Sequence, residues 1–132
     1  MRYSRLLLGL AVVLLVPAAY TQSLSAPTIT QCDLTEGDFT VSWDEVSGAT
    51  KYAVEVVAVY DVGGGCPGEP VVYEDTTLDT TYSGSVSDYN MGSDPIGLVF
   101  RVKALDRPAK GSTGRQNNPF SECTLIVAPT CE

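Results

Sequence analysis

Apolar and polar residues alternate in two segments near the middle of the chain. In residues 39–43, FTVSW, every second side chain is apolar, and the same alternation starts at Tyr52 and continues to Val56. Successive side chains of a strand point to opposite faces, so each segment is predicted to be a strand with one apolar face. A short polar turn, VSGAT, separates the two. We expect Trp43 and Tyr52 in the core, where the Trp43 indole N–H needs a hydrogen-bond partner.

The same reasoning predicts further strands on both sides of this pair. They comprise residues 26–30, 71–75, 81–87, 98–105 and 123–127. Segment 98–105, LVFRVKAL, alternates most regularly, with Arg101 and Lys103 on the polar face. Turn-like segments 33–38 and 88–97 separate other strands, and no amphipathic helix is predicted. About seven short strands joined by turns predict an all-β fold, an antiparallel two-sheet sandwich.

A glycine run lies in the predicted loop at residues 60–70, YDVGGGCPGEP. Glycine-rich loops bind phosphate when they join a strand to a helix and carry Lys and Ser or Thr, and this loop lacks that context. We therefore predict a flexible hairpin loop that a disulfide at Cys66 fixes in place.

The amino-terminal segment has the parts of a secretory signal peptide. Basic residues precede an apolar run at residues 6–16, and small residues follow it. The run is shorter than the ~20 apolar residues of a membrane-spanning helix, and an uncleaved anchor is the alternative interpretation. Residues 1–21 are predicted to be removed, with cleavage after Thr21 or as late as Ser25, which leaves residues 22–132 as one secreted domain.

The predicted mature chain is strongly acidic. Without Arg2 and Arg5 it has 6 basic and 16 acidic side chains, a net charge of −10, and the sequence contains no His. Such a surface argues against binding to nucleic acid and to anionic membranes. We expect no stable membrane insertion after signal cleavage, whereas cations or basic partners are compatible with this charge.

Four cysteines, Cys32, Cys66, Cys123 and Cys131, remain after the predicted cleavage. An even number in an exported chain predicts disulfides. Zinc is the competing interpretation, but the chain lacks a Cys-x-x-Cys pair and any His that would complete a site. Four cysteines allow three pairings, and the spacings alone do not choose among them.

The residue types needed for catalysis are scarce. Without His, neither a Ser-His-Asp nor a Cys-His arrangement is available, and no Ser-x-x-Lys motif occurs. Carboxylate pairs such as Asp75 with Asp79, or Asp44 with Glu45, are the residues that glycoside hydrolysis would need. Acidic loop residues more often form a solvated surface, so we predict a non-enzymatic protein without a cofactor.

Calcium is a further possibility. Asp33, Glu36 and Asp38 lie close in sequence, and hard cations take oxygen ligands from such loops. The group lacks the EF-hand pattern, and a charged turn is the simpler interpretation.

A family pattern runs through five segments of the chain. They are Ala26-Pro27, FTVSWD at 39–44, VSGATKYAV at 46–54, VFRVKA at 99–104 and PFSE at 119–122. With these segments the chain resembles the fibronectin type III family over essentially all of residues 22–132. The resemblance implies the family's sandwich fold, for which a related immunoglobulin-like sandwich is the alternative.

The chain departs from the family at two points. Leu98 stands where the family usually has a corner tyrosine, so the corner hydrogen bond is expected to be absent. Disulfides are also unusual for the family. Its strand arrangement would place three cysteines toward one end of the sandwich and Cys123 at the other, which implies the pairs Cys32–Cys131 and Cys66–Cys123.

The polar segment 106–122 is the predicted partner-binding loop. It holds three of the six basic residues of the mature chain, and loops at the end of a sandwich commonly carry recognition. An ordinary solvated connection is the alternative. The candidate contact residues are Arg107, Lys110, Arg115, Gln116, Asn117, Asn118 and Phe120.

Three functions are compatible with these features. The resemblance implies a secreted module for interaction or adhesion, with an extracellular protein or glycan as its partner, although the family's Arg-Gly-Asp motif is absent. The second is a subunit of an extracellular fibre or surface assembly, which would self-assemble through exposed sheet edges. The third is a carbohydrate-associated accessory module that stacks sugars on Tyr60, Tyr73 and Tyr89.

Overall fold

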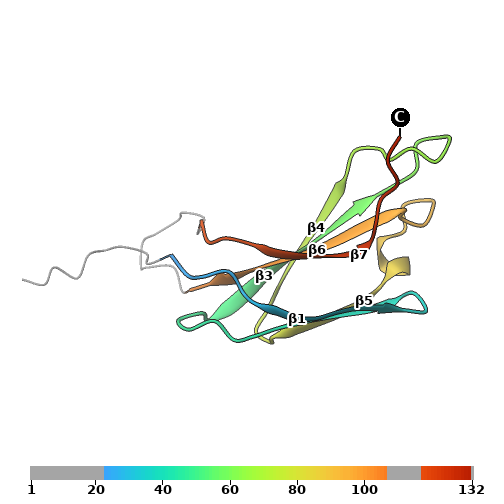
Figure 1. Cartoon of the computed structure of the whole chain (residues 1–132). Coiled ribbons are helices and arrows are strands. Elements are labelled where there is room, and N and C mark those ends of the chain that lie inside the picture. The colour runs from blue at the N-terminus through green and yellow to red at the C-terminus, as the bar shows by residue number, and fades with distance from the viewer. Residues whose placement is uncertain (1–22, 107–116, 132) are drawn as a thin grey trace, which may run out of the picture.

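The computed structural model describes residues 23–106 and 117–131, and the predicted signal peptide lies outside them. The described residues form two antiparallel sheets (Figure 1). The three-stranded sheet has the order β1-β2-β5, with β1 Ile29–Thr35, β2 Asp38–Trp43 and β5 Thr81–Ser85. The four-stranded sheet has the order β4-β3-β6-β7, with β3 Lys51–Val59, β4 Val71–Thr77, β6 Gly97–Leu105 and β7 Ser121–Ile126. The predicted all-β, two-sheet sandwich is confirmed.

The core lies between the sheets and comes from the alternating positions of the sequence. Its members on the three central strands are Phe39, Val41, Trp43, Tyr52, Val54, Val56, Ala58, Leu98, Phe100, Val102 and Ala104. Trp43 meets Tyr52 edge-on and stacks on Phe100, with ring centroids 5.5 and 6.0 Å away. Burial of large apolar side chains, worth about 1.5–3 kcal/mol each, holds the two sheets together. Among the described residues no acceptor reaches Trp43 Nε1, so the partner expected for the indole is missing.

The first strand differs from its prediction. β1 starts at Ile29 and continues through the segment that was predicted as a turn. Only Glu36 and Gly37 form the turn to β2, and both have positive φ, 53° and 84°. Positive φ at both central residues is typical of the type I′ turns that close tight β-hairpins. Glycine adopts this conformation without steric cost. The predicted six-residue turn is therefore wrong, because Glu36 gives no sequence signal for this conformation.

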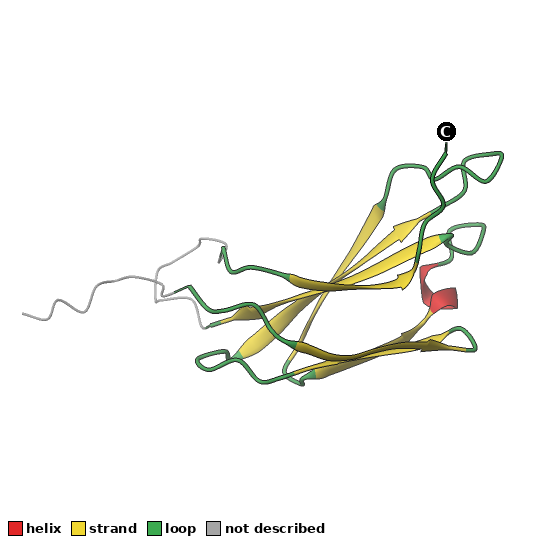
Figure 2. Cartoon of the chain, in the orientation of Figure 1, coloured by secondary structure: helices red, strands yellow, loops and turns green. Residues whose placement is uncertain are grey.

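Two other strand ends also differ. β5 stops at Ser85, where the chain enters a short 3-10 turn, η1 Val86–Tyr89, on its way to the other sheet (Figure 2). The Asp88 carboxylate accepts a hydrogen bond from the Ser85 amide at 3.0 Å and closes the start of this turn. β7 begins at Ser121, earlier than predicted.

The polar turn after β2 carries the chain from one sheet to the other. Val46 is buried at its start, and its amide donates to the Tyr52 hydroxyl at 3.0 Å. Gly48 adopts φ 89°, which an L side chain rarely does. Tyr52 is thus both a core residue of β3 and the anchor of the connection that precedes it.

Two disulfides, Cys32–Cys123 and Cys66–Cys131, use all four cysteines. The prediction of disulfides is confirmed, but the pairs that the family resemblance implied are wrong. Cys32 lies in the middle of β1, because β1 is longer than predicted, and it faces Cys123 of β7. β1 and β7 are edge strands of opposite sheets, so this disulfide joins the sheets along one side of the sandwich.

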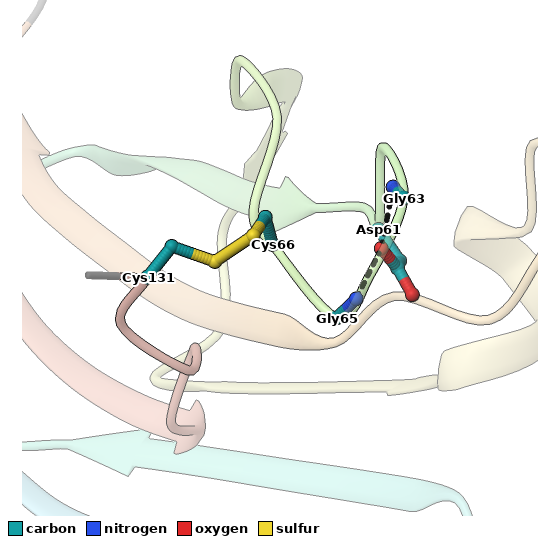
Figure 3. Close-up of a disulfide and its surroundings, with 5 residues drawn as sticks. All are labelled: Asp61, Gly63, Gly65, Cys66 and Cys131. Atoms are coloured by element: carbon teal, nitrogen blue, oxygen red, sulfur yellow. Dashed lines mark hydrogen bonds between the residues drawn. A yellow bond between two sulfur atoms is a disulfide. The ribbon is translucent and has the colours of Figure 1, made fainter.

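The second disulfide follows from strand direction. β3 and β7 both run antiparallel to β6, so both end at the same end of the sandwich. The loop after β3 carries Cys66, the tail after β7 carries Cys131, and the two meet there with Cα atoms 5.4 Å apart (Figure 3).

The glycine run in this loop folds around one carboxylate. Asp61 Oδ1 accepts hydrogen bonds from the amides of Gly63 and Gly65 at 2.7 and 3.2 Å (Figure 3). The three consecutive glycines have positive φ, which explains their residue type without any ligand. The predicted hairpin loop held by a disulfide at Cys66 is confirmed.

Candidate functional site

The predicted partner-binding loop is only partly described. Arg107, Lys110, Arg115 and Gln116 lie outside the described residues, and their role stays a prediction. Asn117 is exposed, as a contact residue would be.

Asn118 does not serve as an exposed contact. Its side chain is buried, its Oδ1 accepts from the Leu24 amide at 3.0 Å, and its Nδ2 donates to the Ala104 carbonyl at 2.7 Å. The amide therefore ties the end of β6 to the segment before β1. Its inclusion among the contact residues was wrong, because an exposed and a buried Asn look alike in a polar segment.

Phe120 lies half-buried against two cations on the outer face of the four-stranded sheet. The Arg101 guanidinium and the Lys103 ammonium lie 4.2 and 4.8 Å from its ring centroid, within the range of cation–π attraction. Arg101 also pairs with Glu55 at 3.0 Å and with Glu122 at 3.8 Å. Glu55 of β3, Glu122 of β7 and Phe120 just before β7 thus surround the Arg101 guanidinium.

An apolar row borders these charges. Val57 of β3 is paired with Val72 of β4 on one side and with Val99 of β6 on the other. The three side chains alternate with the buried positions and so point outward, and Val72 is 49% exposed. We call this row and the group of Glu55, Arg101, Lys103, Phe120 and Glu122 the outer face.

Three tyrosines, Tyr60, Tyr73 and Tyr89, pack at the core, away from the outer face. Tyr89, which was expected on the surface for sugar stacking, is buried, so that expectation was wrong. Tyr60 and Tyr73 are half-buried, and their hydroxyls lie 3.2 Å apart. Burial and the neighbouring Tyr73 hydroxyl raise the pKa of Tyr60 to about 12.

The Tyr60 hydroxyl also donates to the carbonyl of Tyr89, at the crossing from β5 to β6. The resemblance placed Leu98 where a corner tyrosine would bond such a crossing, and Leu98 is fully buried beside Ala58. Tyr60, which directly follows β3, therefore makes a hydrogen bond to the connection between β5 and β6 in place of a corner tyrosine. The sequence of β6 alone does not show this replacement.

The carboxylate pairs considered for glycoside hydrolysis are split. Asp75 lines a hollow of about 200 Å³, whereas Asp79 and Glu45 line a separate hollow of about 400 Å³. Asp44 is exposed and is not among the residues that line the hollow of Glu45. Neither considered pair shares one cleft.

The calcium candidates do not come together either. Asp33 lies on β1, Glu36 in the hairpin turn and Asp38 on β2. Within residues 23–106 and 117–131, no group of three or more His, Cys, Asp or Glu side chains is arranged to hold a metal ion.

Comparison with known proteins gives no assignment: no model of a protein family matches the chain, and no curated protein matches it significantly. Of the helical residues that the structure describes, none belongs to a helix long and apolar enough to cross a membrane.

Proposed function

We propose that this protein is a secreted, non-enzymatic β-sandwich module of the fibronectin type III kind that mediates protein interaction or adhesion outside the cell. Two disulfides are compatible with an oxidising compartment. The division of the strands into β1-β2-β5 and β4-β3-β6-β7, together with the five sequence segments, supports the proposed likeness to fibronectin type III domains.

The outer face is the observation that carries this proposal. Protein interfaces combine an apolar centre with aromatic and Arg anchors and a polar rim. Here the valine row adjoins Glu55 and Arg101, and Arg101 in turn contacts Phe120. Because Arg101 is held by Glu55 and stacked near Phe120, little side-chain freedom remains to be lost on binding.

The predicted loop 106–122, of which residues 107–116 lie outside the described residues, joins β6 to β7. Phe120 belongs to both the loop and the outer face. We therefore propose that the loop and the outer face contact the same partner.

The experiment is a native pull-down from the extracellular fraction under non-reducing conditions. We expect the unchanged chain to retain a partner that the Val72→Asp variant loses, because the substitution places a charge in the apolar row. Ser83→Asp is the matched control, since Ser83 is exposed on the other sheet. Equal retention by all three proteins would refute the role of the outer face.

A fibre subunit is the second candidate, and the outer edge of β4 favours it. β4 ends the four-stranded sheet, and Val72 on it is exposed. Glu74 and Asp75 on the same strand act against strand addition, as charges on edge strands do. Multi-angle light scattering at high concentration separates the candidates: a strict monomer contradicts the fibre.

A further inference from the structure

The sandwich is closed along one side and hollowed along the other. On the side of β1 and β7, the Cys32–Cys123 disulfide joins the sheets, and the Ser121 hydroxyl donates to the carbonyl of Pro27. On the opposite side, β4 and β5 are the two edge strands, and a hollow of about 200 Å³ lies between them.

We infer that this hollow is a binding site for an organic cation, an ammonium or guanidinium group. The inference goes beyond the proposed function and does not depend on the outer face. The residues that line the hollow are Val54 and Val56 of β3, Tyr73, Glu74 and Asp75 of β4, Tyr82 of β5 and Tyr89 of η1.

The walls of the hollow are aromatic. Tyr73 and Tyr89 meet edge to face with ring centroids 4.9 Å apart, and Tyr82 comes from the facing sheet. The faces of tyrosine rings attract cations, most strongly where water is partly excluded. Burial raises the pKa of Tyr82 and of Tyr89 further above the physiological range, so neither phenol adds negative charge to the hollow.

Asp75 supplies negative charge on the inner side of the edge strand. It is paired with Val54 in the same inward row in which Tyr73 is paired with Val56. Its Oδ2 accepts from the Tyr82 hydroxyl at 2.9 Å, a bond that crosses from one sheet to the other. Its Oδ1 accepts from the Thr76 amide at 2.8 Å, and the residue is exposed, so the carboxylate lies at the mouth of the hollow beside the Tyr82 hydroxyl.

The Asp75 carboxylate has no cationic partner within the described part of the chain, and Glu74, which is paired with Glu55, points to the outer side of the sheet. The ion pairs found there both belong to Arg101, and neither involves Asp75 or Glu74. With a formal net charge of −8 on the whole chain, an anionic ligand is repelled and a cationic one is attracted. A cation would gain from Asp75 and from the ring faces together.

The size of the hollow limits the ligand to one head group. Pockets for drug-sized molecules are roughly 300–1,000 Å³, and this one is about 200 Å³. Tyr89 is buried and offers no exposed stacking platform, so an extended glycan is disfavoured. The cation is either a free small amine or the side chain of a Lys or Arg on a partner protein.

Titration by ¹H–¹⁵N NMR with choline chloride, at ionic strength balanced by sodium chloride, tests the inference. We expect saturable shifts at Tyr73, Asp75, Tyr82 and Tyr89. Glucose, as a neutral probe, is expected to give none. Shifts that do not saturate, or that sodium chloride alone reproduces, would overturn the inference.

Variants locate the charge that matters. Asp75→Asn is expected to weaken choline binding about tenfold, because it removes the charge but keeps an oxygen acceptor for Tyr82. Tyr73→Phe keeps the ring and should change the Kd by less than about twofold. Asp79 lies outside the hollow, so Asp79→Asn is the matched control. If Asp75→Asn does not fold, Tyr73→Leu, which removes a ring from the wall of the hollow, replaces it and must also weaken binding. Equal affinity of the charge variant and the control contradicts the inference.

A second titration identifies the source of the cation. Tighter binding of a short lysine peptide than of choline, lost when the lysine ammonium is acetylated, points to a partner side chain. Tighter binding of choline points to a free amine. Either result supports the cation site, and failure of both probes to bind refutes it.

Discussion

At the scale of single residues, Trp43 contributes most through its size. It is almost completely buried between Tyr52 and Phe100, yet its indole N–H has no partner among the described residues. An unpaired buried donor costs about 1–3 kcal/mol, so packing has to outweigh that cost.

We predict that Trp43→Ala lowers the free energy of unfolding by roughly 3–5 kcal/mol. Trp43→Phe is the matched control and should cost much less, because it keeps an aromatic ring and removes the unpaired N–H. Urea unfolding followed by circular dichroism measures both. Equal midpoints for the Ala variant and the unchanged protein would show that Trp43 is not a core anchor.

Tyr60 illustrates a different role, that of a hydrogen-bond donor at a crossing. We predict that Tyr60→Phe lowers stability by about 1–2 kcal/mol, since it leaves the Tyr89 carbonyl without this donor. A Thr76→Ser change on the exposed surface serves as the control. An unchanged denaturation midpoint for Tyr60→Phe would contradict this role.

The same residue predicts a dependence of stability on pH. The pKa of Tyr60 is near 10 in the unfolded chain and about 12 in the folded one. Between these values the unfolded state loses the proton first, so stability is fully present below pH 10 and falls as the pH rises toward 12. Between pH 10 and pH 12 the melting temperature of Tyr60→Phe should fall less steeply than that of the unchanged protein. Identical slopes for the two proteins would contradict the raised pKa of Tyr60.

At the scale of elements, the sequence predicts strands well where their alternation is unbroken. The strands around Trp43, Tyr52 and Phe100 have a strict period of two, and all three form as expected. β1 was misplaced because its pairing shifts between Ile29 and Gln31, which interrupts the alternation. A bulge of this kind depends on the neighbouring strand and leaves no pattern in the sequence alone.

The candidate functional residues likewise depend on contacts between strands that the sequence alone does not show. Phe120 was predicted as a contact residue from its residue type and loop, and that role stays a prediction, whereas its contacts with Arg101 and Lys103 depend on strand register. Tyr89 was misassigned to the surface because η1, which turns it inward, has no periodic signal. Sequence identified two of the tyrosines at the hollow, Tyr73 and Tyr89, without showing that they meet.

The β1–β2 turn offers a direct test at this scale. Glu36 has φ 53°, a conformation that Asn tolerates better, so Glu36→Asn should stabilise the protein by about 0.5–1 kcal/mol. Gly37→Ala should destabilise it by about 1 kcal/mol, although space is open around Gly37, because its φ is 84°. Thermal unfolding compares the melting temperatures of the two variants. A lower melting temperature for Glu36→Asn together with a higher one for Gly37→Ala would contradict the turn geometry.

At the scale of the whole molecule, the two disulfides have different tasks. Cys32–Cys123 joins the edge strands of the two sheets along one side of the sandwich, whereas Cys66–Cys131 fastens a loop to the tail beyond β7. Their positions follow from the strand order, which the spacing of cysteines does not reveal.

We predict that Cys32→Ser with Cys123→Ser lowers stability by about 3–5 kcal/mol. The matched double variant, Cys66→Ser with Cys131→Ser, should cost less, because the tail it releases lies outside the core. Chemical denaturation of both proteins checks the order. A larger loss from the second pair would contradict this division of tasks.

We propose that the molecule as a whole presents the outer face of the four-stranded sheet to its partner. The most direct measurement compares the affinities of the captured partner for the unchanged chain, for Arg101→Ala and for Ser83→Ala, after circular dichroism has shown all three to be folded. We expect Arg101→Ala to raise the Kd by a factor of about 30 and Ser83→Ala to leave it unchanged. Equal affinities for all three proteins would contradict the proposal.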